Sequence, residues 1–90
     1  MRKYQNYNKT NLRKIDWAVV TKILKYLFQN SFEKRTNLAM VSGLQYARFI
    51  RYLKWLEFVN WVEIKEIDGF KMVKLSKTGQ EICKKLKEFQ

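Results

Sequence analysis

The chain has 90 residues, of which 47% are hydrophobic and 16% are aromatic. This length suits one domain with a single small core, and so many core-forming residues exclude a chain that is disordered throughout. The 19 lysines and arginines outnumber the 8 acidic residues, which gives a formal net charge of +11. A surface of this charge attracts polyanions, with nucleic acid as the first candidate and anionic membrane as the second.

Several function classes find no support in the sequence. No apolar run approaches the roughly 20 residues of a membrane span, and the polar amino terminus lacks the apolar centre of a signal peptide, so we expect a cytoplasmic protein. A chain without histidine and with one cysteine offers little to a metal ion. Three glycines form no phosphate-binding loop and the acids form no cluster, so we expect no enzyme and assign no catalytic or metal-binding residue.

Residues 1–11 show no periodicity, and no acidic residue precedes Asp16. They form either a frayed terminus or a basic arm that contacts a DNA groove or a second subunit. The folded domain is expected over residues 12–90.

A first helix is predicted from Ile15 to about Gln29, because apolar residues recur there at spacings of three and four. Asp16 suits the positive end of this helix. Trp17 and Tyr26 widen the apolar arc, either as part of a broad core face or as a contact with a second copy of the chain.

A second, short helix is predicted after residues 32–35, which are expected to be a loop or a brief strand. Thr36 is the expected N-cap, and Gly43 ends the helix in the left-handed conformation. The helix from Gln45 to about Glu57 follows, with an apolar stripe for the core and a cationic opposite side.

The remaining segment predicts two strands and a last helix. Residues 61–67 alternate between apolar and polar, Asp68-Gly69 is a strong hairpin turn, and residues 70–75 form the returning strand. Ser76 then caps a helix that runs to about Glu88. This order predicts an α+β fold, the winged helix-turn-helix, with a three-helix core, a two-stranded hairpin wing and a carboxy-terminal helix.

In a helix-turn-helix, the amino-terminal part of the second helix enters the major groove of DNA while the first helix crosses the backbone. Arginine suits guanine and glutamine suits adenine, so the helix at 45–57 is the expected reader of bases. Lys71 is the best wing candidate, although Glu63, Glu66 and Asp68 weaken the field around it. The predicted DNA-binding residues are Thr36, Ser42, Gln45, Tyr46, Ala47, Arg48, Arg51, Lys54 and Lys71.

The segments TNLAMVSGLQYARFIRYLKWLEF and KLSKTGQEICKKL resemble the helix pair and the strand-to-helix junction of small archaeal winged helix-turn-helix DNA-binding proteins. This group includes chromatin-associated members that dimerise through a long carboxy-terminal helix. The resemblance covers roughly residues 15–89, and its junction pattern is shared by many winged-helix families. It implies double-stranded DNA binding as a homodimer, without cofactor, in transcription regulation or chromosome organisation.

The predicted last helix has only about 12 to 14 residues, so we expect any dimer to use the first helix, the last helix and the amino-terminal arm rather than a long coiled coil. The candidate interface residues are Trp17, Tyr26, Ile82, Cys83, Leu86 and Phe89. Cys83 is most simply a small apolar residue that faces the core or a partner, with an intermolecular disulfide or a redox role as the alternatives. Two other functions stay open: a protein-interaction scaffold that exposes Trp55 and Trp61, and binding of RNA or single strands.

Overall fold

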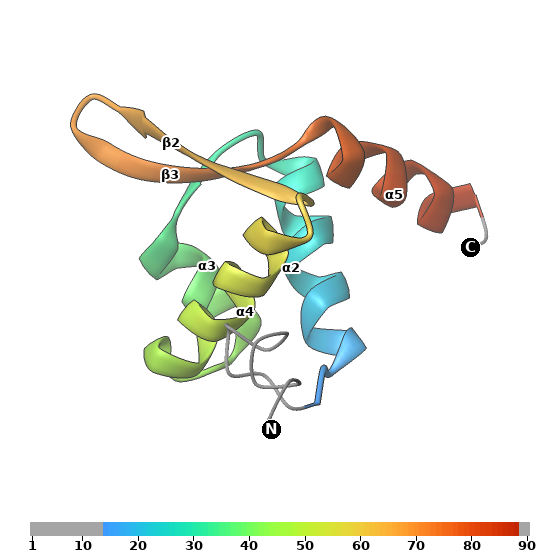
Figure 1. The fold of residues 1–90 in the computed structure, drawn as a ribbon, viewed down its shortest axis with the longest axis horizontal. Helices are drawn as coiled ribbons and strands as arrows, with labels where there is room; N and C mark the ends of the chain where they lie inside the picture. The colour runs from blue at the N-terminus through green and yellow to red at the C-terminus, as the bar shows by residue number, and fades with distance from the viewer. Residues whose placement is uncertain (1–13, 89–90) are drawn as a thin grey trace, which may run out of the picture.

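The computed structural model describes residues 14–88. The predicted arm at residues 1–11 and the interface candidate Phe89 lie outside the described residues. Within residues 14–88, four helices and three strands follow one another in the order α2 (Trp17–Gln29), β1 (Glu33–Lys34), α3 (Arg35–Ser42), α4 (Tyr46–Phe58), β2 (Val62–Ile67), β3 (Phe70–Leu75) and α5 (Lys77–Glu88). The hairpin of β2 and β3 projects to one side of the helices, and α5 extends toward the other (Figure 1). The predicted α+β winged helix-turn-helix fold is confirmed.

The sheet is antiparallel with the strand order β1-β3-β2. The short segment before α3 is therefore a strand, which pairs Glu33 with Val73 and Lys34 with Met72. The hairpin turn is the predicted Asp68-Gly69, and both residues have a positive φ, 53° and 83°. This is the turn whose twist matches the twist of two paired strands, so the sequence also specified the register of the wing.

Helix α2 begins two residues later than its apolar pattern predicts. Asp16 is its N-cap, and the Asp16 carboxylate accepts a hydrogen bond of 3.0 Å from the backbone N–H of Ala18. The backbone N–H of Asp16 also donates to the hydroxyl of the buried Tyr52 at 3.0 Å. The start of α2 is thereby attached to the middle of α4.

The prediction that Thr36 caps the second helix is wrong. Helix α3 begins at Arg35, its N-cap is Lys34, and no side chain supplies a capping hydrogen bond there. Because Lys34 is still paired with Met72 in the sheet, the chain passes directly from strand to helix, and Thr36 already lies inside the first turn. The predicted end is confirmed, since Gly43 is the C-cap with a φ of 76°.

Trp61 and Ser76 are paired at the base of the β2–β3 hairpin, next to the pair of Val62 and Leu75. The backbone N–H of Ser76 donates to the carbonyl oxygen of Trp61 at 3.0 Å, and the Ser76 hydroxyl accepts from the N–H of Gly79 at 3.0 Å. The predicted cap of the last helix is thus confirmed. Gly79 packs closely on this pair. A Cβ atom at its position would lie 2.0 Å from the Trp61 carbonyl oxygen.

The core lies between the helices and the inner face of the sheet. Its largest fully buried side chains belong to Tyr52, Phe49, Ile23, Leu24, Leu38, Leu56, Val20, Val62 and Val73. The Cys83 sulfur lies in this core, 3.7 Å from the Leu24 carbonyl oxygen, and burial raises the pKa of its thiol. The sequence left open whether Cys83 faces the core or a partner. In the structure it faces the core of its own chain.

The three tryptophans of the chain meet where α2, α4 and β2 come together. Their ring centroids are 5.8 Å apart for Trp17 and Trp55, 6.5 Å for Trp17 and Trp61, and 5.5 Å for Trp55 and Trp61. The contacts of Trp55 with Trp17 and with Trp61 are edge-to-face, an arrangement that stabilises beyond the area that it buries. Trp55 and Trp61 are half-buried in this cluster, whereas Trp17 stays exposed.

Candidate nucleic-acid interface

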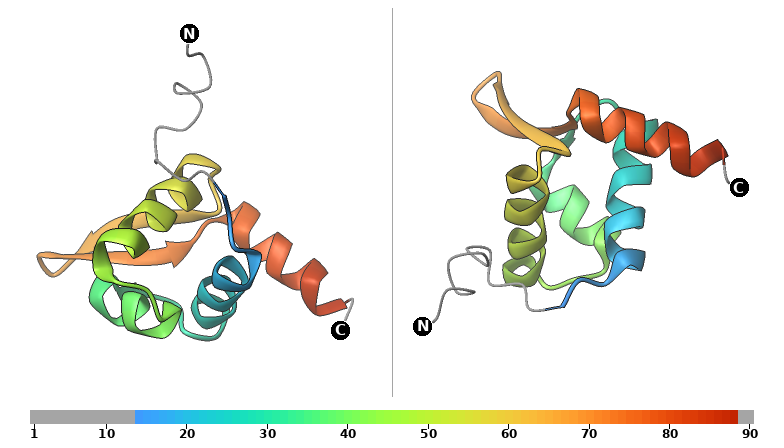
Figure 2. Two further views of the ribbon diagram at one scale, coloured as in Figure 1. Left: turned by 90° about the horizontal axis from the view of Figure 1, so that it is seen from below. Right: turned by 45° about the vertical axis from the view of Figure 1, so that its right-hand side comes forward.

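Helices α3 and α4 and the tight turn between them build the helix-turn-helix. Figure 2 shows α4 and the hairpin on one side of the molecule and α5 on the other. The Ser42 hydroxyl fixes the turn, because it donates to the Ala39 carbonyl oxygen at 2.6 Å and accepts from the Leu44 N–H at 3.2 Å. Ser42 is only 3% exposed, so the prediction that it contacts DNA is corrected to a role inside the turn.

The outer side of α4 carries the exposed cations of the helix-turn-helix. Ala47, Arg48, Arg51 and Lys54 are all exposed on it, while Phe49, Tyr52, Leu53 and Leu56 face the core. The only acid in α3 and α4 is Glu57, near the carboxy-terminal end of α4. The amino-terminal two-thirds of the helix thus combines positive charge with flexible hydrogen-bond donors.

Two further predicted residues stand at the start of α4. Gln45 is exposed at the N-cap position, where its side chain makes no capping hydrogen bond and is left to other contacts. Tyr46 is 45% exposed, and its ring packs on Phe49 at a centroid distance of 6.2 Å. Both residues lie at the end of the helix that enters the groove in this class of fold.

Arg48 is held in place by an aromatic ring of its own helix. Its guanidinium lies 6.0 Å from the centroid of the Tyr52 ring, one turn further along α4. Tyr52 is itself fixed by burial and by the hydrogen bond from Asp16. A guanidinium that stacks in this way loses less freedom when it binds a base edge or a phosphate.

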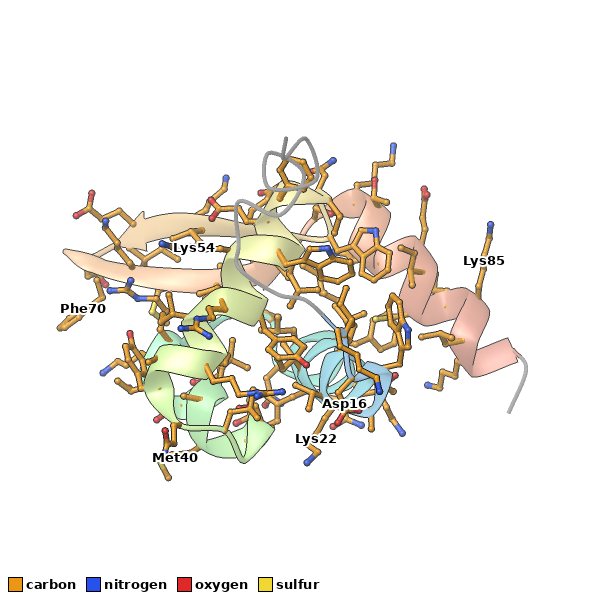
Figure 3. The ribbon with its side chains drawn as sticks, turned by 60° about the horizontal axis from the view of Figure 1, so that its bottom comes forward. Asp16, Lys22, Met40, Lys54, Phe70 and Lys85 are labelled. Carbon is orange, nitrogen blue, oxygen red and sulfur yellow. The ribbon has the colours of Figure 1, made fainter. Side chains whose placement is uncertain are left out.

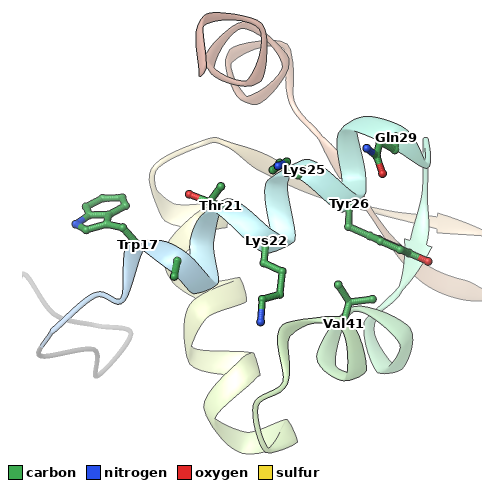
Figure 4. A pocket seen from close by; sticks show the side chains of 8 residues that line it. Trp17, Thr21, Lys22, Lys25, Tyr26, Gln29 and Val41 are labelled. Carbon is green, nitrogen blue, oxygen red and sulfur yellow. The ribbon is translucent and has the colours of Figure 1, made fainter. Parts of the chain in front are cut away.

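A cation from outside the helix pair lies beside the turn. The Lys22 side chain extends from α2 toward the segment that joins α3 and α4 (Figure 4). Its Nζ atom is 4.0 Å from the position that a Cβ atom on Gly43 would take. Sequence patterns could not predict this approach, because Lys22 lies far along the chain from Gly43 and its position depends on how α2 packs on α3.

The wing carries little net charge. Lys65, Lys71 and Lys74 are balanced in number by Glu63, Glu66 and Asp68. In the strand register, Lys71 lies directly opposite Glu66, and Lys74 lies opposite Glu63. Lys71 is exposed, as its prediction requires, but the field around it is weakened by its cross-strand neighbour.

An aromatic residue, Phe70, stands beside the wing turn. It is 56% exposed, and the Lys34 ammonium lies 4.9 Å from its ring centroid. Figure 3 shows Phe70 at the far end of the hairpin, on the same side of the molecule as Met40 and away from Lys85 of α5. The strand alternation contained the signal for this exposure, because inward Val73 places Phe70 and Met72 on the opposite face of the strand.

A polar network links α2 to the helix-turn-helix through β1. The Glu33 carboxylate accepts hydrogen bonds from the Asn37 amide at 2.9 Å, the Tyr26 hydroxyl at 3.2 Å and the Lys34 N–H at 3.1 Å. The amide of Asn37 is the main cause that lowers the pKa of Glu33. Partial burial, and then the Glu33 charge, raise the pKa of Tyr26.

The candidate dimer residues lie along α2 and α5. Trp17 and Leu86 are exposed, Tyr26 and Ile82 are half-buried, and Cys83 belongs to the core. A shallow groove of about 610 Å³ runs along α2 and is lined by Trp17, Ala18, Thr21, Lys22, Lys25, Tyr26, Gln29 and Val41 (Figure 4). A smaller groove of about 380 Å³ lies between α2 and α5, with Phe28, Cys83 and Leu86 among its lining residues.

Two classes of site are not found among residues 14–88. These residues hold no group of three or more potential metal ligands. None of the helices in the same range is long and apolar enough to cross a membrane.

Solved structures similar to this chain include two transcriptional regulators and a DNA-binding protein. A MarR-family transcriptional regulator from Silicibacter pomeroyi matches with a TM-score of 0.70 and 20% identity over 93% of this chain and 59% of its own. A transcriptional regulator from Thermotoga maritima matches with a TM-score of 0.72 and 17% identity over 78% of this chain and 50% of its own. The DNA-binding protein Sso10a-2 from Sulfolobus solfataricus matches with a TM-score of 0.58 and 21% identity over 77% of this chain and 75% of its own.

These likenesses show the winged-helix fold. The chain spans between half and three-fifths of the length of the two regulators, and the matches include bacterial proteins beside the one from Sulfolobus. No protein-family model matches the chain. No curated protein matches it either.

Proposed function

We propose that the protein binds double-stranded DNA in the cytoplasm as a transcription regulator, with α4 in the major groove. The observation that carries this proposal is the exposed face of α4, where Arg48, Arg51 and Lys54 project from a helix that follows a tightly fixed turn. A helix of this kind fits the major groove, and its arginines suit guanine edges and phosphates. The structural neighbours, two transcriptional regulators and a DNA-binding protein, support the same assignment.

The proposed contacts divide by their chemistry. Gln45, Tyr46, Ala47, Arg48 and Arg51 would face base edges or the adjoining phosphates, and Lys54 the backbone beyond them. Thr36, which is exposed on α3, and Lys71 of the wing would contact flanking phosphates. The predicted unit, residues 12–90, would supply all of these contacts without cofactor or metal.

The narrower proposal is a small archaeal regulator or chromatin protein. It is supported by the resemblance of residues 36–58 and 74–86 to that group and by the likeness to the Sulfolobus protein. Selection of bound sequences from a random duplex pool would separate the two roles. An enriched site indicates a regulator, whereas no enrichment indicates architectural binding.

We also propose that the protein acts as a homodimer. Trp17 and Leu86 are exposed apolar side chains on α2 and α5, with Tyr26 and Ile82 half-buried along the same helices. A dimer would place two copies of α4 on successive turns of the major groove, about 34–36 Å apart. The mass in solution, measured with and without duplex, tests this part independently of DNA binding.

The salt dependence of binding tests the proposal as a whole. If each subunit neutralises about four to six phosphates, log affinity falls against log salt with a slope near −0.9 per contact, so about −4 to −5. Single-stranded DNA and RNA, added as competitors at about 150 mM salt, should displace labelled duplex poorly. Failure to bind duplex under these conditions would favour a protein-interaction scaffold, and efficient displacement by single strands would favour RNA or single-strand binding.

A further inference from the structure

The exposed ring of Phe70 carries no charge and takes no part in the proposed contacts with phosphates. It is the first residue after the Asp68-Gly69 turn and lies opposite Ile67, the last residue of β2. Both side chains are on the face of the hairpin that points away from the core, because inward positions on β3 belong to Val73 and Leu75. The end of the wing thus presents a large apolar group.

The charge of the wing cannot account for a strong contact with phosphates. Its three lysines are matched by three acids, and the lysines at positions 71 and 74 lie opposite glutamates in the register. If the wing contributes to DNA binding, its distinctive contribution is therefore apolar.

A cation lies beside the Phe70 ring. The Lys34 ammonium, 4.9 Å from the ring centroid, comes from β1, which pairs with β3 two residues further along. A cation on one side of the ring steadies it and brings a positive charge beside it. More than half of the Phe70 surface nevertheless stays exposed. The free protein therefore lacks the stabilisation that burial of this ring would give.

We propose that Phe70 is a wedge that enters the minor groove beside the site of α4 and partly unstacks one base step. This inference rests on the proposed binding of duplex DNA. Apolar wedges of this kind kink a duplex by about 20–90° toward the major groove. Pyrimidine–purine steps unstack most easily, so the wedge selects a TpA or CpA step at a fixed distance from the bases under α4, without hydrogen bonds to them.

The test measures binding and bending separately on one 30-base-pair duplex. The duplex carries TpA steps, a dye at each end for energy transfer, and 2-aminopurine at one TpA step after another. The wild-type protein should shorten the end-to-end distance and raise 2-aminopurine emission at one step. Phe70→Ala should abolish both signals and should lower affinity by about tenfold or more, while leaving the salt slope unchanged because it removes no charge.

Phe58→Ala is the matched control. Phe58 is 66% exposed, but it lies at the carboxy-terminal end of α4 rather than at the wing. The control should bend and bind DNA as the wild type does, and both variants should unfold at the wild-type temperature. Salt-dependent binding without bending, or bending that survives Phe70→Ala, overturns the wedge and leaves the proposed function standing. Absence of duplex binding by the wild type overturns both.

Discussion

The Ser76 hydroxyl donates a hydrogen bond of 2.6 Å to the carbonyl oxygen of Asn60, sixteen residues earlier in the chain. Asn60 has a φ of 65° and is the second residue after the end of α4, and Ser76 directly precedes α5. One side chain thus fixes the exit from α4 and the start of α5 at the same point.

Replacement of Ser76 by alanine should lower the free energy of unfolding by about 1–2 kcal/mol. The substitution removes the cap from the Gly79 N–H and the bond to the Asn60 carbonyl oxygen together. Urea unfolding followed by circular dichroism measures the loss. The exposed Ser31 provides the control, since Ser31→Ala should change stability by less than about 0.5 kcal/mol. Equal losses of stability in Ser76→Ala and Ser31→Ala would contradict the idea that the Ser76 side chain joins the end of α4 to the start of α5.

Gly79→Ala should be far more destabilising than Gly69→Ala. A Cβ atom at residue 79 meets the Trp61 carbonyl oxygen at 2.0 Å, so backbone must move, and we expect a loss of about 3 kcal/mol or more. At Gly69 nothing lies within 4 Å and only the positive φ opposes alanine, which costs about 1–2 kcal/mol. The denaturant midpoints of the two variants show which of them is less stable. If Gly69→Ala were less stable than Gly79→Ala, close packing at Gly79 would not be the larger effect.

Arg48→Ala and Arg51→Ala should each weaken duplex binding. If the side chain contacts a phosphate, the slope of log affinity against log salt becomes shallower by about 0.9. If it reads a base, about 1–3 kcal/mol of discrimination disappears at one position of the site. Lys85→Ala on α5 serves as the control, since Lys85 is exposed on the side away from α4. A larger effect of the Lys85 substitution would place the DNA on a different face.

Arg48→Lys should not restore the binding that alanine removes. Lysine keeps the charge but loses the planar group that lies over Tyr52, as well as the paired donors that suit guanine. Affinities of the two variants for one selected duplex make the comparison. Wild-type affinity in the lysine variant would show that Arg48 acts as a simple charge.

The Glu33 network should make stability depend on acid pH. Because hydrogen bonds lower the pKa of Glu33 in the folded protein, the stabilisation is complete above the unfolded pKa, near 4.3, and is lost as the pH falls through the folded value. Thermal unfolding between about pH 6 and pH 2.5 should therefore show a smaller decrease for Glu33→Gln than for the wild type. Asn37→Ala should also reduce the decrease, because Asn37 is the main cause of the shift.

The elements of the fold followed from short-range patterns. Asp68-Gly69 sets its own turn, Gly43 its own left-handed cap, and Ser76 its own helix start, because each depends on residues within a few positions. Thr36 was assigned wrongly because the pairing of Lys34 with Met72, which is distant in sequence, decides where α3 begins.

The candidate site could likewise be predicted from the sequence only where it depends on residues close together in the chain. The exposed face of α4 could be read from the helical period, whereas the burial of Ser42 depends on how the turn closes. The approach of Lys22 to Gly43 and the contact of Lys34 with Phe70 both depend on elements packing together. No spacing within a single segment reports such contacts.

The grouping of all three tryptophans has a practical consequence for spectroscopy. Every indole of the chain emits from the one region where α2, α4 and β2 meet, and centroid separations of 5.5–6.5 Å allow excitation to pass between the rings. Intrinsic fluorescence therefore reports whether these elements are assembled and carries no signal from an indole at the wing. A bound duplex can then be followed with dyes on the DNA while the same sample reports, at another wavelength, the integrity of the fold.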